Sequence, residues 1–397
     1  MKREKHLCIK RLIGLCKRIP DERRQSGKFK HQLVDVLVIC LLGVICGYET
    51  WDEIRDYAQA KRLFLRRNVG LKRGIPSAAT LRRVLGIIKP AELENVYREW
   101  VKPYIGSCIG KHIPVDGKTI RGASRRGEAN FHMVSAWVRE DGLTMGQVKT
   151  AEKSNEITAI PALLSSLNIA GSIVSIDAMG CQKDIARTII AQDAQYLLAV
   201  KANQPTLHEE IQEYFAWAQK DAIERKFMQS HVEMDFSHGR TAKWQVYTCD
   251  SSWFEDKRDW PFLRTFVCVE RTCTRNGNTS TERAFFISSL HADALAFCKL
   301  VRDHWRIENQ LHWSLDVSFH EDACQVHQGN AVENLSLLRK LALTMIKRDS
   351  SRNASVHRKR KIAAVDDAFA LSILGLCYMK LPWRYGLCYL KTMIRML

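Results

Sequence analysis

The stretch His112-Ile113-Pro114-Val115-Asp116-Gly117-Lys118-Thr119-Ile120-Arg121-Gly122 joins a short apolar run to one carboxylate, a glycine and then basic residues. The apolar run predicts a strand, and an acid at the end of a strand lies at a sheet edge, where a hard cation can reach it. Asp-Gly is also an ordinary hairpin turn. Taken by itself, the stretch leaves both interpretations open.

A second stretch repeats the pattern. Ser172-Ile173-Val174-Ser175-Ile176-Asp177-Ala178-Met179-Gly180 is again an apolar, β-branched run that ends in a single acid. A third acid, Glu308, lies far downstream in an aromatic and basic segment with helical periodicity. Two strand-end aspartates and one helical glutamate predict a metal site that the fold assembles.

The segment between residues 106 and 204 has the periodicity of alternating strands and helices. Three strands come first, and then a helix, a strand, a helix and a strand, which is the order of a ribonuclease H-like core. In that order the first and fourth strands lie side by side, so Asp116 and Asp177 should converge. The expected strands are Ile113–Asp116, His132–Arg139, Leu143–Thr150, Ile173–Asp177 and Tyr196–Lys201, and the helices are Asn155–Leu167 and Gln182–Gln192.

The fold class is therefore expected to be α/β, with a ribonuclease H-like catalytic core, a β-rich insertion and an N-terminal helical domain. The insertion should hold a helix near Leu207–Lys220 and strands around Lys243–Tyr247, Phe262–Val269 and Ala284–Ser288. The expected divisions are a basic helical domain at 1–105, the first part of the core at 106–204, the insertion at 205–290, a helical segment with Glu308 at 291–349, and a basic then apolar tail at 350–397.

The positive charge is concentrated at the front of the chain. Residues 1–112 hold 24 Lys/Arg against 11 Asp/Glu, which is +13 of the total formal charge of +18. Such a basic region suggests a polyanionic partner. The first 30 residues are either a solvated tail or an arm that contacts phosphates.

A short helix is expected over Pro76–Leu85, after helices over His31–Cys46 and from Trp51 to Arg67. Ser77 is a suitable N-cap after Pro76, and Arg82 and Arg83 should lie on the exposed side. This pattern resembles the recognition helix of a helix-turn-helix, and an ordinary helical bundle explains it nearly as well.

The thirteen cysteines form no C-x-x-C pair, which favours reduced thiols in a cytoplasmic protein over a zinc ribbon or a disulfide framework. The apolar run Leu33–Gly47 is too short for a bilayer and contains Asp35. No signal peptide is evident. We therefore expect no membrane partner.

Around Glu308, helical spacing places His304, Leu311, His312 and Leu315 on the same face, with Trp305 packed on a neighbouring face. One interpretation is an amphipathic helix with two core histidines. Another is a His304–Glu308–His312 metal cluster, although the two histidines are eight residues apart and no H-E-x-x-H is present. Two Asp and one Glu instead suit two-metal phosphoryl transfer, in which carboxylates hold two Mg²⁺ ions about 3.5–4 Å apart.

These residues resemble a known family, the H-repeat-associated, Rhs-linked group of insertion-sequence DDE transposases. The resemblance spans roughly residues 20–370. It rests on motifs in the same order along the chain: Val115–Gly122, Ser175–Gln182, Tyr196–Gln204, His238-Gly239-Arg240 and Trp305–Asp322.

The resemblance implies a transposase that binds the inverted repeats of its element and target DNA as double strands, as a homo-oligomer. It implies Asp116, Asp177 and Glu308 as the catalytic and metal-binding triad, with two Mg²⁺ ions, or Mn²⁺ in their place. Two further readings remain open: a nuclease that cleaves without joining, and an inactive DNA-binding relic. The expected DNA contacts are Lys118, Arg121, Arg82, Arg83, Lys201, Arg240, Arg302 and Arg306.

The sequence departs from related insertion-sequence transposases around Glu308. Their Tyr-x-x-Arg-x-x-x-Glu-x6-Lys pattern falls here on Val301, His304, Glu308 and Leu315, so only the glutamate matches. Arg302 or Arg306 is expected to replace the missing phosphate-binding cations. Residues Cys377–Leu397 look unlike the family and are interpreted as read-through from a damaged element.

Overall fold

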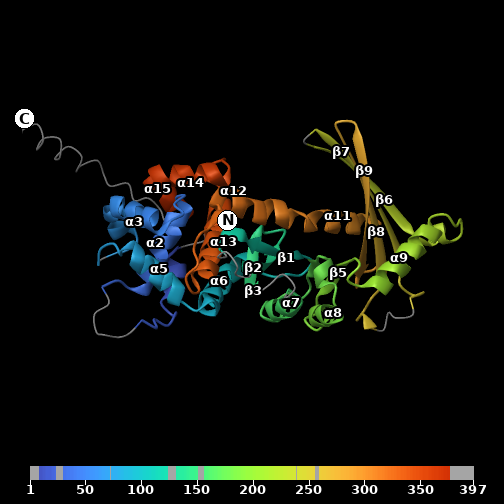
Figure 1. The fold of residues 1–397 in the computed structure, drawn as a ribbon, viewed down its shortest axis with the longest axis horizontal. Coiled ribbons are helices and arrows are strands. Elements are labelled where there is room, and N and C mark those ends of the chain that lie inside the picture. Colours follow the sequence, from blue (N-terminus) through green and yellow to red (C-terminus); the bar gives the residue numbers. More distant parts are fainter. Residues whose placement is uncertain are drawn as a thin grey trace, which may run out of the picture.

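The computed structural model describes residues 9–23, 30–71, 73–123, 131–150, 156–237, 239–254 and 259–375. A nine-stranded sheet forms the middle and one end of an elongated mixed α/β molecule, and a helical body forms the other end (Figure 1). Residues 1–8 and 24–29 of the predicted basic arm, His238 and the tail segment Cys377–Leu397 lie outside the described residues. No helix within the described ranges is both long and apolar enough to cross a membrane.

Five strands form the central part of the sheet, in the spatial order β3-β2-β1-β4-β5. The first three are antiparallel, whereas β1, β4 and β5 are parallel. The prediction that the first and fourth strands lie side by side is therefore confirmed. The strands are β1 (His112–Ile120), β2 (Phe131–Val138), β3 (Leu143–Thr150), β4 (Ile173–Ile176) and β5 (Gln195–Val200).

Strand β1 is longer than expected, which corrects the prediction that it ends at Asp116. It continues through Gly117 to Ile120 and pairs with β2 along that extension, so Asp116-Gly117 is not a hairpin turn. The pairing of β1 with β4 ends at Val115 opposite Ile176. Asp116 therefore lies just past the end of the β1–β4 pairing, because β4 ends at Ile176 while β1 continues to Ile120.

The insertion extends the same sheet instead of forming one of its own. Strand β9 pairs antiparallel with β5, and the order continues β9-β8-β7-β6 to the edge. The edge strand was not predicted, although Val232, Met234 and Phe236 alternate with polar residues, and in the structure these three apolar side chains face solvent. The remaining bounds are α9 (Pro205–Ala218), α10 (Glu224–Phe227), β6 (Gln229–Ser237), β7 (Arg240–Asp250), β8 (Thr265–Arg275) and β9 (Asn278–Ser288).

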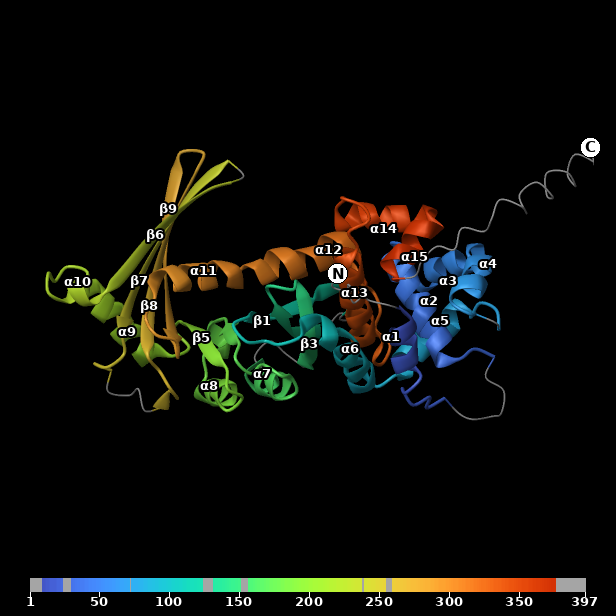
Figure 2. The same ribbon diagram turned by 180° about the vertical axis from the view of Figure 1, so that it is seen from behind.

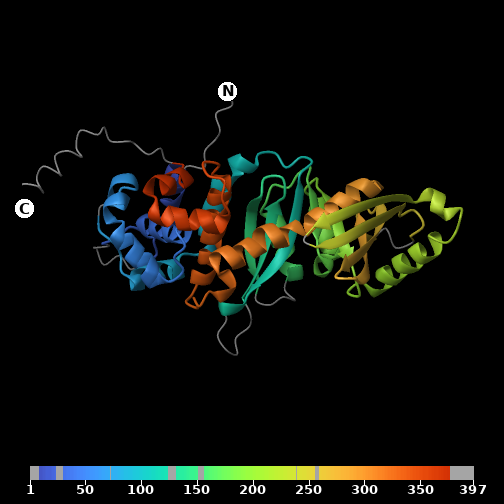
Figure 3. The same ribbon diagram turned by 90° about the horizontal axis from the view of Figure 1, so that it is seen from above.

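Helices cover the two faces of the sheet differently. Helices α7 (Glu156–Ser165) and α8 (Lys183–Ile190) lie on one side of the central strands. The long helix α11 (Ala294–His304) runs along the other side, and it contacts β6, β7 and β8 as well as β1 and β4 (Figures 2 and 3). One helix therefore spans the distal strands β6–β9 and the central strands.

The helical body contains the N-terminal helices together with the last helices of the chain. Helix α13 packs against α2, α5 and α6, and the backbone N–H of Ile9 donates to Leu374 O at 2.9 Å. The body is thus one core built from both ends of the described chain. Its helices are α1 (Ile9–Cys16), α2 (Leu33–Ile45), α3 (Trp51–Ala60), α4 (Arg62–Asn68), α5 (Ala78–Ile87), α6 (Pro90–Ile105), α13 (Ala331–Arg348), α14 (Val356–Val365) and α15 (Asp367–Ile373).

Two predicted helical segments are divided in the structure. The helix expected from Trp51 to Arg67 divides at Lys61 into α3 and α4. The helical segment expected at 291–349 consists of α11, a π-helical turn over Glu308–His312, α12 (Trp313–Phe319), a short 3₁₀ turn η6 (Glu321–Ala323) and α13. Periodicity does not reveal a single inserted residue, and a π-turn is such an insertion.

Candidate active site

Asp116 and Asp177 lie side by side because of the strand register. Val115 pairs with Ile176, and each aspartate is the next residue on its parallel strand. Asp177 caps the 3₁₀ turn Ala178–Gly180, with its carboxylate accepting from the Gly180 N–H at 3.4 Å. A Cβ at Gly180 would overlap the Ile176 side chain, so this tight turn requires glycine.

Glu308 approaches Asp116 from the π-helical turn that follows α11. The same turn brings in His312, whose Nδ1 lies 3.4 Å from Asp116 Oδ2 and 3.5 Å from Glu308 Oε2. One ligand atom from each of these three residues lies within 4.8 Å of the others. The sequence left His312 open as either a core histidine or a metal ligand with Glu308, and the structure places it beside both Glu308 and Asp116.

The three acids influence one another electrostatically. Burial raises the pKa of Asp116 well above its ordinary value, and the negative charges of Glu308 and Asp177 raise it further. A hydrogen bond from His312 lowers the pKa of Glu308. A buried carboxylate crowded by two others is stabilised by a bound cation, and oxygen donors are the ligands that Mg²⁺ and Mn²⁺ prefer. The donor set therefore fits a hard divalent ion.

His304 belongs to a different polar group, which corrects the alternative of a His304–Glu308–His312 cluster. Its Nδ1 lies 2.8 Å from the Ser175 hydroxyl, and His112 Nε2 lies 2.7 Å from the same oxygen. Burial lowers the pKa of His304 to about 4 and that of His112 to about 3. These neutral imidazoles connect α11 with β1 and β4. Trp305, which was expected to pack inside, is instead 57% exposed.

Lys118 does not reach the surface, which corrects its assignment as a DNA contact. Its ammonium is enclosed by Asp316 at 2.6 Å and by Glu321 and Asp322 at 3.3 Å, with the side chain only 9% exposed. Burial lowers the pKa of Lys118, but the negative charges of the three carboxylates have the larger combined effect, so the pKa is raised. The residue ties β1 to the segment that follows α12.

The other predicted DNA-contacting cations differ in their partners and in how far they are exposed. Arg302 forms ion pairs with Glu233 and Asp235 of β6, and Arg306 pairs with Asp303 at 2.9 Å. Arg302 therefore holds the distal strands and is not free to bind phosphate, whereas Arg306 is half-exposed. The remaining predicted contacts are exposed: Arg82, Arg83, Arg121, Lys201 and Arg240.

Helix α5 has the predicted form. Ser77 accepts from the Thr80 N–H at 3.2 Å, and Leu81, Val84 and Leu85 are buried, while Arg82 and Arg83 face solvent.

The cysteines agree with the expectation of free thiols, since all ten cysteines among the described residues are unpaired and nine of them are buried.

Comparison with known proteins gives matches over most of the chain. A family model described as "Transposase DDE domain" matches residues 109–345, and one described as "DDE_Tnp_1-associated" matches residues 15–101. The chain is 36% identical over 378 residues to "Putative transposase YncI" of Escherichia coli O157:H7, covering 94% of this chain and 96% of that protein.

It is also 36% identical over 377 residues to "H repeat-associated putative transposase YhhI" of Escherichia coli K12, covering 92% of this chain and 98% of the relative. Among solved structures, a piggyBac transposase synaptic complex with hairpin DNA aligns over 95% of this chain and 83% of that one. Its TM-score is 0.37 at 9% identity, which is too low to bear on the fold.

Proposed function

Because the chain belongs to the transposases with a DDE domain, we propose that it binds the ends of a bacterial insertion element and catalyses metal-dependent DNA strand cleavage and strand transfer. The observation that carries the proposal is the close approach of Asp116 from β1 and Glu308 from the turn after α11. Asp177 supports it from the residue after β4, where its charge acts on Asp116, although it is not in the close group that Asp116 and Glu308 form with His312. The strand order β3-β2-β1-β4-β5 supports a ribonuclease H-like core.

In this proposal Asp116, Asp177 and Glu308 hold two divalent ions, Mg²⁺ or Mn²⁺. When bound, such ions lower the pKa of the attacking water or 3′-hydroxyl and stabilise the leaving oxygen. The chain itself supplies the placement: two paired strands fix the aspartates, while the His112–Ser175–His304 group holds α11 and so orients Glu308. His312 lies between Asp116 and Glu308 and helps to position both carboxylates.

Binding of double-stranded DNA is assigned to the exposed cations. Arg121 directly follows β1 and has an 83% exposed side chain, so it is open to a phosphate. Arg82 and Arg83 project from α5 in the helical body. We assign Arg121, Arg306, Lys201 and Arg240 to phosphate contacts and the α5 pair to the element ends, with the protein acting as a homo-oligomer in the cytoplasm.

The experiment incubates the full-length chain with linear DNA carrying the inverted repeats of its element and a supercoiled target, with Mg²⁺ or with chelator. We expect nicks at the repeat ends and joined products, both dependent on metal and absent in Asp116→Asn. Cleavage without joining would support a nuclease instead. DNA binding without cleavage in the wild-type protein would support an inactive relic and overturn the proposal.

A surface substitution, Arg82→Ala with Arg83→Ala, tests recognition by α5. Removing the N-terminal helices is unsuitable, because α2, α5 and α6 share their core with α13. We expect the double variant to lose its preference for repeat DNA over scrambled DNA in a competition assay. Its cleavage should be weak, because the DNA is no longer positioned correctly. Each bidentate arginine–base contact contributes about 1–3 kcal/mol of discrimination.

A further inference from the structure

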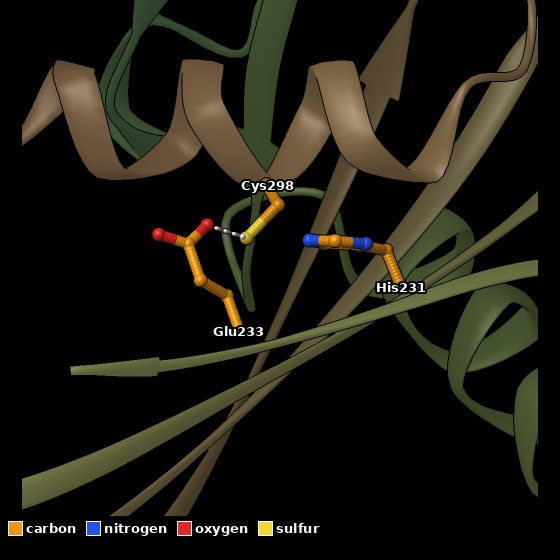
Figure 4. Close-up of side chains that lie close together, drawn as sticks. All are labelled: His231, Glu233 and Cys298. Atoms are coloured by element: carbon orange, nitrogen blue, oxygen red, sulfur yellow. Dashed lines mark hydrogen bonds between the residues drawn. The ribbon is translucent and has the colours of Figure 1, made fainter.

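A second group of metal-binding side chains lies away from the three acids, where the edge strand β6 meets α11. His231 and Glu233 are two residues apart on β6, so both project to the same face of the sheet. Cys298 comes down from α11 and is 1% exposed. Figure 4 shows the imidazole and the carboxylate pointing toward the sulfur from the strand below.

The three donors already lie close together. One ligand atom from each residue lies within 4.8 Å of the others, and Cys298 Sγ donates to Glu233 Oε2 at 3.6 Å. Tetrahedral Zn²⁺ with its usual bond lengths places donor atoms about 3.4–3.8 Å apart. Side-chain rotations that move the ligand atoms by about 1 Å would therefore bring them to these distances, without a movement of the strand or the helix.

The surroundings of Glu233 match those of a ligating carboxylate. Arg302, one turn after Cys298 on α11, pairs with the other oxygen of Glu233 and with Asp235 Oδ2 at 3.3 Å. Carboxylates that bind metals are commonly held in this way by a second residue. With Cys298 as a thiolate, Glu233, Asp235 and Arg302 bring the net charge of the group to −2, which a divalent cation neutralises.

The donor types select the metal. A thiolate and an imidazole are soft or borderline ligands that suit Zn²⁺, whereas Mg²⁺ and Ca²⁺ require oxygen. Burial, followed by the charge of Glu233, raises the pKa of Cys298 to about 11. A thiol in that condition is a poor nucleophile and a poor redox sensor at neutral pH, so neither of those uses explains the cluster.

We propose that His231, Glu233 and Cys298 bind one thiophilic divalent ion, Zn²⁺ by preference, with water as the fourth ligand. On binding, the S–H bond breaks, its proton leaves to solvent, and a metal–sulfur bond replaces it. The site is independent of the proposed transposition chemistry. It fastens the edge of the distal strands to α11, the helix that leads to Glu308.

The test uses the chelator-treated full-length protein and Co²⁺ as an optical probe, with no DNA present. We expect one Co²⁺ per chain to give a thiolate-to-cobalt charge-transfer band, and Zn²⁺ to displace it. Cys298→Ser and His231→Gln should both lose the band. Cys273→Ser, which changes a partly exposed cysteine on β8, and Asp116→Asn should both keep it.

Thermal unfolding gives a second readout. Zn²⁺ should raise the melting temperature of the wild-type chain and of Cys273→Ser by more than that of Cys298→Ser or His231→Gln, in which only the acidic site can bind the ion. If Cys298→Ser fails to fold because Cys298 is buried, His231→Gln still tests the proposal, since His231 is partly exposed. Absence of the band in the wild-type protein, or its persistence in both ligand variants, would overturn the proposal.

Discussion

His312 Nδ1 lies 3.4 Å from Asp116 Oδ2, so an imidazole from a π-helical turn meets a carboxylate from the middle of a strand. The same nitrogen lies 3.5 Å from Glu308 Oε2. Glu308 and His312 are four residues apart, so both project from the same face of the turn toward the sheet. The histidine is therefore part of the acidic site and not merely packing behind it.

The first prediction concerns the triad. Asp116→Asn, Asp177→Asn and Glu308→Gln should each abolish DNA cleavage yet leave DNA affinity nearly unchanged, because affinity comes from exposed Lys and Arg. Cleavage assays and equilibrium binding on the same preparations measure both. Asp184→Asn, an 84% exposed acid on α8, is the matched control and should keep cleavage. Loss of binding in all three variants would indicate a folding role.

The second prediction concerns His312. His312→Asn should raise the Mg²⁺ concentration needed for half-maximal cleavage by about 10-fold or more, because residues that support metal ligands commonly contribute at this level. A metal titration of the cleavage rate measures the shift. His320→Asn makes the same change at an exposed position with positive φ and should behave like the wild type. An unchanged Mg²⁺ requirement in His312→Asn would assign that histidine to packing alone.

The third prediction separates two neighbouring cations. Lys118→Met removes the cation that contacts Asp316, Asp322 and Glu321, which is 1% exposed and keeps only the charges of Arg339 and Lys340. It should lower the free energy of unfolding by about 3 kcal/mol. Arg121→Met should hardly change stability and should weaken DNA binding in a salt-dependent way. Urea unfolding and binding at two salt concentrations distinguish them. Equal stability of the two variants would contradict the buried ion cluster.

The fourth prediction explains why glycine follows Asp116. A Cβ at Gly117 would overlap Glu156 and His132, whose side chains hydrogen-bond to each other beneath β1. Gly117→Ala should therefore cost about 1–3 kcal/mol of stability through overpacking. Gly14→Ala in α1, where a Cβ meets nothing within 4 Å, should be neutral or stabilising by about 0.5–1 kcal/mol. Thermal or urea unfolding gives both values.

The fifth prediction concerns pH. Burial, followed by the charges of His304 and Arg139, lowers the pKa of His112 from 6.5 to about 3 in the folded protein. Between these values the unfolded chain binds a proton that the folded chain does not, so stability is highest above pH 6.5 and falls as the pH is lowered. Urea unfolding at about pH 7.5 and about pH 5 should show the loss.

His112→Gln should reduce that pH dependence, because it removes one of the two buried imidazoles that resist protonation. The exposed His320→Gln should leave the dependence unchanged. A wild-type protein whose stability did not decrease over this range would contradict a neutral His112 in the folded state.

The sequence by itself determined the strands and helices of the central sheet and the family. The apolar run Ile173–Asp177 indicates a short strand that is buried on both faces, and Leu143–Thr150 is a strand with the bounds predicted. The predicted strand order places Asp116 beside Asp177, as the pairing of β1 with β4 does in the structure. Local chemistry also identified Ser77 as an N-cap.

Only the tertiary structure decided what surrounds each charged side chain. Lys118, Arg302 and Arg121 look equivalent along the chain, yet the first is enclosed by three carboxylates, the second is bound to β6 and the third is exposed. Two further features depend on contacts between residues more than 80 positions apart. They are the approach of His312 to Asp116 and the pairing of β9 with β5. Sequence periodicity reports local burial, whereas the partners of a charge are set by long-range packing, and for that reason the fold decided them.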